Sequence, residues 1–140
     1  MIKIDSTDLN KFSVILRELP DEIKNDVRKV VKNSAFNIER NAKSSVNVNT
    51  GHLRRSISTK MGDMEAIIHT SNLKYAPMVE FGTRPHIIRA KNKKALYWKG
   101  ASHPVKQVNH PGSKAKPYLI PAFEKEKDQF LEKLKEVIKW

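Results

Sequence analysis

Histidines are the side chains in this sequence best suited to metal binding or proton transfer, and their spacing fits neither role closely. The five are His52, His69, His86, His103 and His110. None belongs to the helical pattern in which two histidines and a glutamate form a zinc site. His103 and His110 each precede a proline, but no carboxylate lies near them in the sequence, so loop polarity explains them better than a metal site. We therefore expect no metal and no cofactor.

Carboxylate pairs and serines likewise suggest no catalytic constellation. Asp5/Asp8 and Asp21/Glu22 stand where helices are expected to begin, and capping explains acidic residues there. The candidate nucleophiles lack the flanking glycines of a nucleophile elbow; they are Ser44, Ser45 and Ser56. The five glycines are scattered, so no phosphate-binding loop is present. These patterns predict a protein that is not an enzyme.

Glu80 is the one carboxylate beside a long basic run. As a general base it would need a companion acid or histidine within hydrogen-bond reach, and His86 is the nearest candidate in the sequence. A salt bridge to Arg84 or Arg54 is the interpretation that we favour, because ion pairs are the commoner role of such residues. A bridge between two subunits would fix the register of an assembly.

Positive charge is concentrated in one third of the chain. The net charge is +12, with 27 basic and 15 acidic residues. Nine of the basic residues, and no acidic residue, lie between Phe81 and Phe123, which leaves 18 basic against 15 acidic residues elsewhere. A solvated surface is one explanation. The alternative is a surface that faces phosphate or an acidic partner.

Composition narrows the class of protein further. The chain has 140 residues, enough for one domain with one core, and we expect a single domain over residues 1–140. Cysteine is absent, which excludes disulfides and thiolate chemistry. No signal peptide or membrane-spanning segment is apparent. We expect a protein made and used in a cytoplasm, or in a particle assembled there.

Hydrophobic periodicity predicts two helices before residue 46. Leu9, Phe12, Leu16 and Leu19 fall at helical spacing after the cap candidates Ser6 and Thr7. Pro20 suits the first turn of a second helix. The apolar face of this second helix then extends over about six turns through Ile23, Val27, Val30, Val31, Ser34, Ile38 and Ala42.

The remainder of the chain predicts short elements and one more long helix. Residues 52–60 and 64–70 suggest a hairpin around Gly62-Asp63, and residues 86–90 and 95–98 suggest a second one around a basic turn. Residues 75–81 suggest a short helix with Tyr75, Met78 and Val79 inward, closed by a left-handed Gly82. Residues 99–117 suggest a long basic loop. Pro121 suits the start of the last helix, whose apolar stripe contains Phe123, Phe130, Leu134, Val137 and Ile138.

This order of elements defines an α+β fold. We expect a small, mostly antiparallel sheet made of two hairpins, packed on one face by two long helices from the N-terminal part of the chain and one C-terminal helix.

Three stretches together resemble one protein family. They are TGHLRRSI (residues 50–57), YAPMVEFGT (residues 75–83) and KPYLIPAFE (residues 116–124). In this order and spacing they are similar to the head–tail joining proteins of tailed bacteriophages, also described as neck, tail-completion or tail-component proteins. The residues that match the family's motifs look like turns, caps and packing anchors: Gly51, Tyr75, Glu80, Phe81, Gly82, Pro117, Pro121 and Phe123.

The resemblance implies a structural virion component without catalytic activity, from a phage or prophage. Such proteins assemble, often as oligomeric rings, at the junction between the head and the tail, with connector and tail proteins on either side and genomic DNA passing through the lumen. It implies assembly in the bacterial host cytoplasm, no membrane partner and no small-molecule substrate.

The basic segment is not implied by the resemblance, and its partner is left open. Its candidate DNA-channel or partner-facing residues are Arg84, Arg89, Lys91, Lys93, Lys94, Lys99, Lys106, Lys114 and Lys116. Tyr97 and Trp98 could stack on bases, although a hairpin core or a subunit interface suits them better. The alternatives to a virion component are a small basic nucleic-acid-binding protein and a toxin-like RNase that uses Glu80 or His86.

Overall fold

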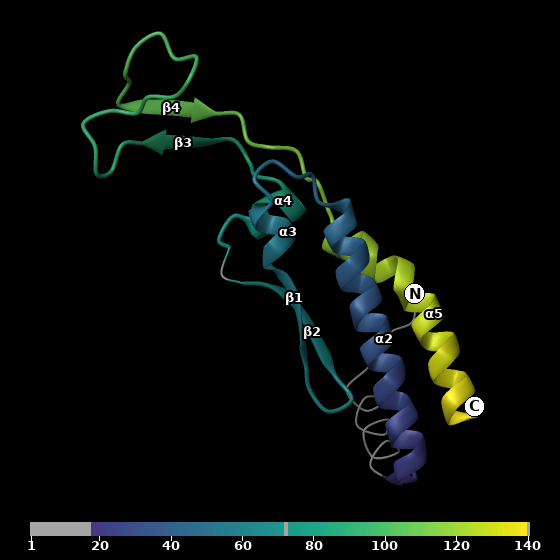
Figure 1. Cartoon of the computed structure of the whole chain (residues 1–140). Coiled ribbons are helices and arrows are strands. Elements are labelled where there is room, and N and C mark those ends of the chain that lie inside the picture. The colour runs from purple at the N-terminus through teal and green to yellow at the C-terminus, as the bar shows by residue number, and fades with distance from the viewer. Residues whose placement is uncertain (1–17, 72, 140) are drawn as a thin grey trace. The chain divides into compact units, whose positions relative to one another are not determined.

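The computed structural model describes residues 18–71 and 73–139, which form two compact units (Figure 1). Of these, residues 18–71 and 118–139 make the first, called here the helical unit, and residues 73–117 make the second, the arm unit. Among the described residues there are four helices and two antiparallel, two-stranded sheets, which confirms the α+β class. The sequence predicted one sheet, whereas each hairpin forms a sheet of its own.

Helix α2 (Asp21–Ser45) is the central element of the helical unit. Pro20 caps it with φ −54°, and Asp21 and Glu22 place negative charge in its first turn, as expected at a helix N-terminus. Its buried residues confirm the predicted face: Val27, Val30, Ser34, Ala35, Ile38 and Ala42. The helix predicted over residues 9–19 lies outside the described residues except for its last two positions.

The chain leaves α2 through a short helix and enters the first hairpin. The sequence predicted a strand from His52, but α3 (His52–Ser56) precedes the strand because Gly51 adopts φ +74° and starts a helical turn that buries Leu53. Strands β1 (Ile57–Met61) and β2 (Ala66–Thr70) pair antiparallel, with Ile57 opposite Thr70 and Met61 opposite Ala66. The predicted turn around Gly62-Asp63 is therefore confirmed.

Alternation along this hairpin determines which side chains face α2. Ile57 is 1% exposed and Ile68 is half-buried, whereas Ile67 and His69 are exposed on the other face. This alternation is the expected pattern for a two-stranded sheet covered on one side only.

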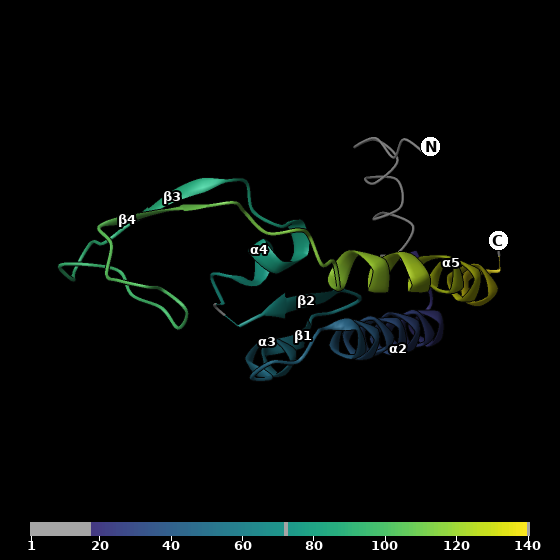
Figure 2. The same ribbon diagram turned by 90° about the horizontal axis from the view of Figure 1, so that it is seen from above.

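Helix α5 (Leu119–Ile138) lies beside α2, as two perpendicular views show (Figures 1 and 2). It begins two residues before Pro121, which is therefore its third residue and still within the turn that tolerates proline. Its buried positions are Ala122 and Glu126, and Phe123 is 54% exposed. The predicted stripe was thus wrong for Phe123. The buried positions of α5 are instead Ala122, one residue before Phe123, and Glu126, three residues after it.

Polar side chains are buried in the helical unit at or near this helix pair. Asn37 Nδ2 of α2 donates a hydrogen bond of 3.0 Å to Oε1 of Glu126, a carboxylate that is only 4% exposed. Ser34 is equally buried, and its hydroxyl has no hydrogen-bond partner among the described residues. A buried acceptor must be matched by a donor, so the Asn37–Glu126 bond fixes how the two helices pair along their lengths.

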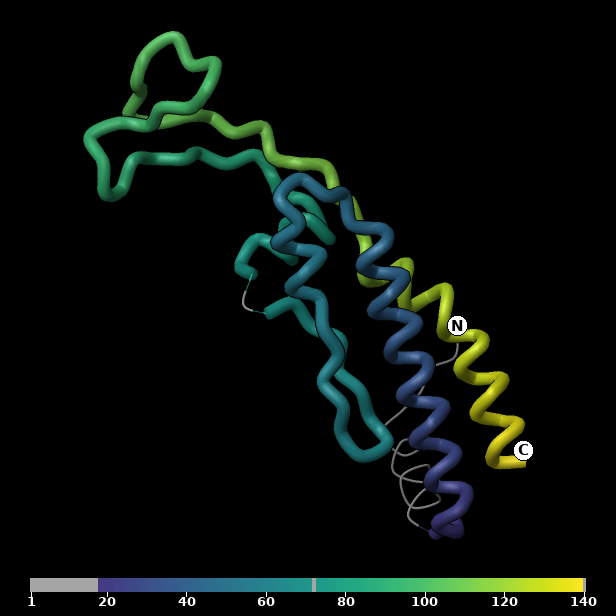
Figure 3. The backbone as a smooth tube through the Cα atoms, viewed as in Figure 1, coloured from purple at the N-terminus to yellow at the C-terminus, as the bar shows by residue number. Residues whose placement is uncertain are grey.

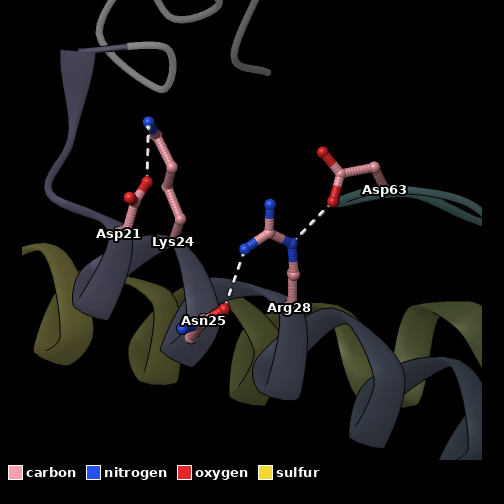
Figure 4. A network of polar contacts seen from close by, with 5 residues as sticks. All are labelled: Asp21, Lys24, Asn25, Arg28 and Asp63. Atoms are coloured by element: carbon pink, nitrogen blue, oxygen red, sulfur yellow. Dashed lines mark hydrogen bonds and ion pairs between the residues drawn. The ribbon is translucent and has the colours of Figure 1, made fainter.

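The tip of the β1–β2 hairpin is held to α2 by an exposed network (Figure 4). Arg28 donates from Nε to Asp63 at 2.6 Å and from Nη1 to Asn25 at 2.9 Å. The hydrogen bond from Arg28 lowers the pKa of the Asp63 carboxyl. Because both side chains are solvent-exposed, this network orients the hairpin more than it stabilises the fold.

Glu39 makes the more protected ionic contact between α2 and β1. Its carboxylate accepts from Lys43 Nζ at 2.6 Å and from Thr59 Oγ1 at 2.5 Å. The hydrogen bond from Lys43, followed by that from Thr59, lowers the pKa of Glu39 below its ordinary value of 4.5. Only 18% of the Glu39 side chain is exposed, so solvent screens these bonds less than those at Asp63.

Replacing Glu39 with glutamine is expected to destabilise the fold in a pH-dependent manner. A lowered folded-state pKa contributes stability at pH values above the unfolded pKa, and this stability is lost as the pH falls through the folded pKa. Glu39→Gln should therefore cost on the order of 1 kcal/mol at neutral pH, and the cost should vanish in acid. Urea unfolding between pH 7 and pH 3 measures this, with the exposed Glu136→Gln as control. A difference that is constant across this range would contradict the assignment.

No helix in the described part of the chain is long and apolar enough to cross a membrane.

Candidate interaction surface

The arm unit begins with α4 (Ala76–Phe81), the predicted short helix. Its inward side differs from the prediction for Tyr75 and Met78, which are 41% and 53% exposed, whereas Val79 is half-buried. The buried residues of the helix are Ala76 and Glu80. The apolar residues were assigned inward on hydrophobicity alone. A six-residue helix buries only one narrow side, and here that side contains an alanine and a carboxylate.

Gly82 ends α4 in a conformation that only glycine adopts easily. Its φ is +73°, as predicted, but its ψ of −176° is extended rather than left-handed helical. A Cβ there would lie 2.5 Å from the Ser113 carbonyl oxygen and 2.8 Å from the Ala115 nitrogen. Gly112 is the counterpart on the returning chain, at φ +87°, where a Cβ would collide with the Thr83 carbonyl oxygen. Both glycines are therefore required for the two segments to lie against each other.

These two segments are joined by backbone hydrogen bonds at their base. Thr83 and Ser113 exchange both bonds, at 3.0 and 3.1 Å, and their hydroxyls lie 3.0 Å apart. Lys116 N donates to Val79 O at 2.8 Å, which ties the outgoing chain to α4. The base of the arm unit is thus fixed by the main chain and does not depend on the identity of the basic side chains.

Strands β3 (His86–Arg89) and β4 (Gln107–His110) continue this pairing outward, with His86 opposite His110 and Arg89 opposite Gln107. The sequence predicted residues 95–98 as the partner of β3, and this was wrong. Residues 95–98 contribute a single bridge, Leu96 to Val105, and β4 lies within the segment predicted to be a loop. Residues 84–116 are called the basic arm below.

His86 and His110 stack across the two strands, with ring centroids 5.0 Å apart and planes 30° apart. His86 Nδ1 lies 2.8 Å from the Arg84 carbonyl oxygen, and His110 Nδ1 accepts from Gly112 N at 3.0 Å. The contacts of the His86 ring described here are thus with the Arg84 carbonyl and with the ring of His110. Within residues 18–71 and 73–139, no three histidine or acidic side chains are grouped so that they could hold a metal ion.

Residues 90–106 connect β3 to β4 and form the tip of the arm (Figure 3). Ala90 N donates to Lys106 O at 3.1 Å, and Leu96 and Val105 exchange bonds of 2.7 and 3.0 Å. Tyr97 and Trp98 follow directly and are 68% and 48% exposed. A hairpin core, one of the places expected for this pair, is therefore excluded.

All nine candidate basic residues lie on the basic arm, and each is exposed. The whole arm unit has ten basic residues and one acid, Glu80, so +9 of the net charge of +12 belongs to it. Glu80 itself is only 6% exposed, so the exposed charged side chains of the arm unit are all basic. Like charges repel one another when they are concentrated on so short a segment, and a polyanion or an acidic protein surface would relieve that repulsion.

Fold and charge together describe an α+β protein whose positive charge is concentrated on one paired segment, the basic arm. A family model described as "Bacteriophage HK97-gp10, putative tail-component" matches residues 10–82, a little over half of the chain. The chain belongs to this family, so it is a phage tail component, a structural protein of the virion. Searches of curated proteins and of solved structures found no match.

The matched range divides the candidate residues into two sets. Gly51, Tyr75, Glu80, Phe81 and Gly82 lie inside it. The basic arm begins just beyond its end, as do the later motif positions Pro117, Pro121 and Phe123. Charge counting alone identified the arm, whereas the buried carboxylates Glu80 and Glu126 could not be recognised as buried from the sequence.

Proposed function

We propose that this protein joins the head of a tailed phage or prophage to its tail, as one subunit of a ring around the DNA channel. The observation that carries the proposal is the basic arm: nine exposed cations on one paired segment, with no acidic residue among them. Membership of a tail-component family supports other virion proteins as partners. That further copies of this chain are also partners is part of the proposal.

A DNA channel requires non-specific attraction and no base recognition, because the genome must slide through it. Lysine and arginine on exposed segments provide phosphate contacts that carry no sequence information. Such contacts are strongly weakened by salt, because binding releases condensed counterions. The arm fits this role, with connector and tail proteins as neighbours and assembly in the host cytoplasm.

A small nucleic-acid-binding protein is the alternative, and the exposed Tyr97 and Trp98 favour it specifically. Aromatic side chains beside lysines suit stacking on single-stranded bases. The two functions differ in what a monomer does. A dedicated nucleic-acid binder holds DNA as a monomer, whereas a ring subunit binds weakly until several arms act together.

Native mass spectrometry over a concentration series, paired with DNA titrations in increasing salt, separates the two functions. The proposed function predicts an oligomer of fixed subunit number and DNA binding that rises with assembly. Tight, salt-sensitive binding by a persistent monomer would overturn it in favour of the alternative. If expression of the protein arrests growth, and this arrest is lost when Glu80 or His86 is changed, the result would instead point to an RNase.

A further inference from the structure

An apolar groove of about 400 Å³ lies on the helical unit, at the start of α5. Its apolar lining comes from three elements: Ile38 of α2, Ile68 of β2, and Leu119, Ile120 and Phe123 of α5. Phe123 is 54% exposed, so much of an aromatic ring stays in water beside other apolar side chains. Leu131 lies two turns further along the same side of α5 and is 39% exposed, so apolar surface continues beyond the groove.

The segment before α2 is apolar enough to cover such a surface. Residues 1–17 lie outside the described residues, and their sequence predicts a helix with one apolar side over residues 9–19. Ile2 and Ile4 add two apolar side chains before it. An isolated helix of fewer than about 12–15 residues is only marginally stable in water, so a segment of this length needs an apolar surface to pack against.

The connection to α2 sets the direction of this segment. Glu18 is helical and Leu19 forms a bend. Pro20, with φ −54° and ψ 148°, is extended, and α2 begins at the next residue. Two helices joined by so short a connection usually form an antiparallel pair. Followed back toward residue 1, the segment is therefore expected to run along α2 in the direction of Ile38.

The length of the segment decides which of its residues meet the groove. Ile38 lies 17 residues after the first residue of α2, about 26 Å along the helix. A helix that extends back from Glu18 to Leu9 covers about 14 Å, so Leu9 stops short of the groove. The next five residues, ending at Ile4, add about 8 Å if helical and up to about 17 Å if extended. On either path, Ile2 and Ile4 come within about one or two helical turns of the level of Ile38.

We propose that residues 1–17 form a strap that folds back along α2 and buries Ile2 and Ile4 in the groove around Phe123 of the same chain. Strap and groove belong to one molecule, so docking is favoured by a high effective concentration and needs no second copy. The match to the family model starts at residue 10, so the two docking isoleucines lie outside it. A closed strap keeps this apolar surface from other proteins, and a partner that displaces the strap gains access to it. The inference does not depend on the proposed ring.

Disulfide formation tests the docking, because the chain has no cysteine. Lys3→Cys places a thiol between the two isoleucines, and Lys127→Cys places one at the groove, four residues from Phe123. Oxidised at low protein concentration, this double variant should form an internal disulfide and run as a faster monomer on a non-reducing gel. Lys3→Cys/His69→Cys is the matched control, because His69 is exposed on the outer face of β2, next to Ile68. The groove pair should close at least about tenfold faster than the control pair.

Aspartate at both isoleucines distinguishes docking from chance encounter of the two thiols. Adding Ile2→Asp and Ile4→Asp to the Lys3→Cys/Lys127→Cys chain should slow closure to the rate of the control pair, because a charged side chain is costly to bury in an apolar groove. Equal rates in the groove pair and the control pair would overturn the proposal. A closure rate that the two aspartates leave unchanged would overturn it as well.

Two further results would assign the groove to another occupant and overturn the strap. Faster closure in Lys99→Cys/Lys127→Cys than in Lys3→Cys/Lys127→Cys would assign it to the chain's own arm. Covalent dimers from a mixture of the single variants Lys3→Cys and Lys127→Cys, in place of internal closure in the double variant, would assign it to a second copy. Internal closure at a rate independent of protein concentration supports the strap. Native mass spectrometry of the parent chain tests the ring separately, so either proposal can fail without the other.

Discussion

Changing Lys91, Lys93 and Lys94 together to glutamate is expected to remove most of the DNA binding of the assembled protein and to weaken its assembly. The substitution lowers the charge of the arm unit from +9 to +3, because three positive residues become negative. If each lysine contacts one phosphate, the dependence of log K on log salt should become shallower by about three. Fluorescence anisotropy with a labelled duplex, at several salt concentrations, measures this.

The same triple variant should keep the melting temperature of the parent protein. All three lysines are exposed, and none takes part in an ion pair within the described residues. Surface substitutions of this kind usually change stability by no more than about 0.5 kcal/mol. A large fall in melting temperature would show that these residues pack against the fold, and would contradict their assignment to the exposed surface.

A charge-matched control decides whether DNA binding depends on the position of the lysines or on the net charge of the protein. Glutamate at Lys125, Lys133 and Lys135 changes the net charge by the same amount on exposed positions of α5. DNA binding should fall much less in this variant than in the arm variant. Equal losses in both would mean that the protein attracts DNA through its overall charge, with no special role for the arm.

Replacing Gly82 with alanine is expected to have the largest effect on the arm unit's own structure. Two costs combine at this position. Backbone strain at φ +73° and ψ −176° is on the order of 1–3 kcal/mol for a residue with a Cβ. In addition, that Cβ would lie 2.5 Å from the Ser113 carbonyl oxygen, a backbone atom that can move only if the paired segments separate.

Hydrogen exchange at the base of the arm measures this effect directly. The amides of Thr83, Ser113 and Lys116 form the bonds that Gly82 permits, and in Gly82→Ala they should exchange roughly tenfold faster or more. Gly100→Ala is the matched control, since Gly100 has φ +102° but no atom within 4 Å of its would-be Cβ. Unchanged protection in Gly82→Ala would contradict the view that this glycine fixes the base of the arm.

Long-range pairing explains why some elements were predictable and others were not. Helix α2 has an apolar repeat over six turns, and the β1–β2 turn contains Gly62-Asp63, so both could be predicted from local sequence. The strand that pairs with β3 could not be predicted from local sequence, because residues 95–98 have the stronger local strand pattern. The ladder instead uses residues 107–110, with Gly82 and Gly112 setting the approach of the two segments.

The candidate surfaces show the same division between local and distant information. The absence of acidic residues is visible in the sequence, so the basic arm could be found by counting charges. An apolar groove of about 400 Å³ around Phe123 is lined by residues from α2, β2 and α5, which are far apart in the chain. Hydrophobic periodicity placed Phe123 in the buried stripe. Periodicity identifies the apolar side of a helix, but it does not show which part of that side the neighbouring helix covers.

Negative-stain electron microscopy of the purified protein, at the concentrations where native mass spectrometry detects oligomers, is the most direct test of the central claim. A subunit of the head–tail junction should form closed rings with an open lumen wide enough for duplex DNA, about 20 Å on the scale of its groove dimensions. Particles that remain monomeric at all concentrations, or oligomers without a lumen, would contradict a ring around the DNA channel.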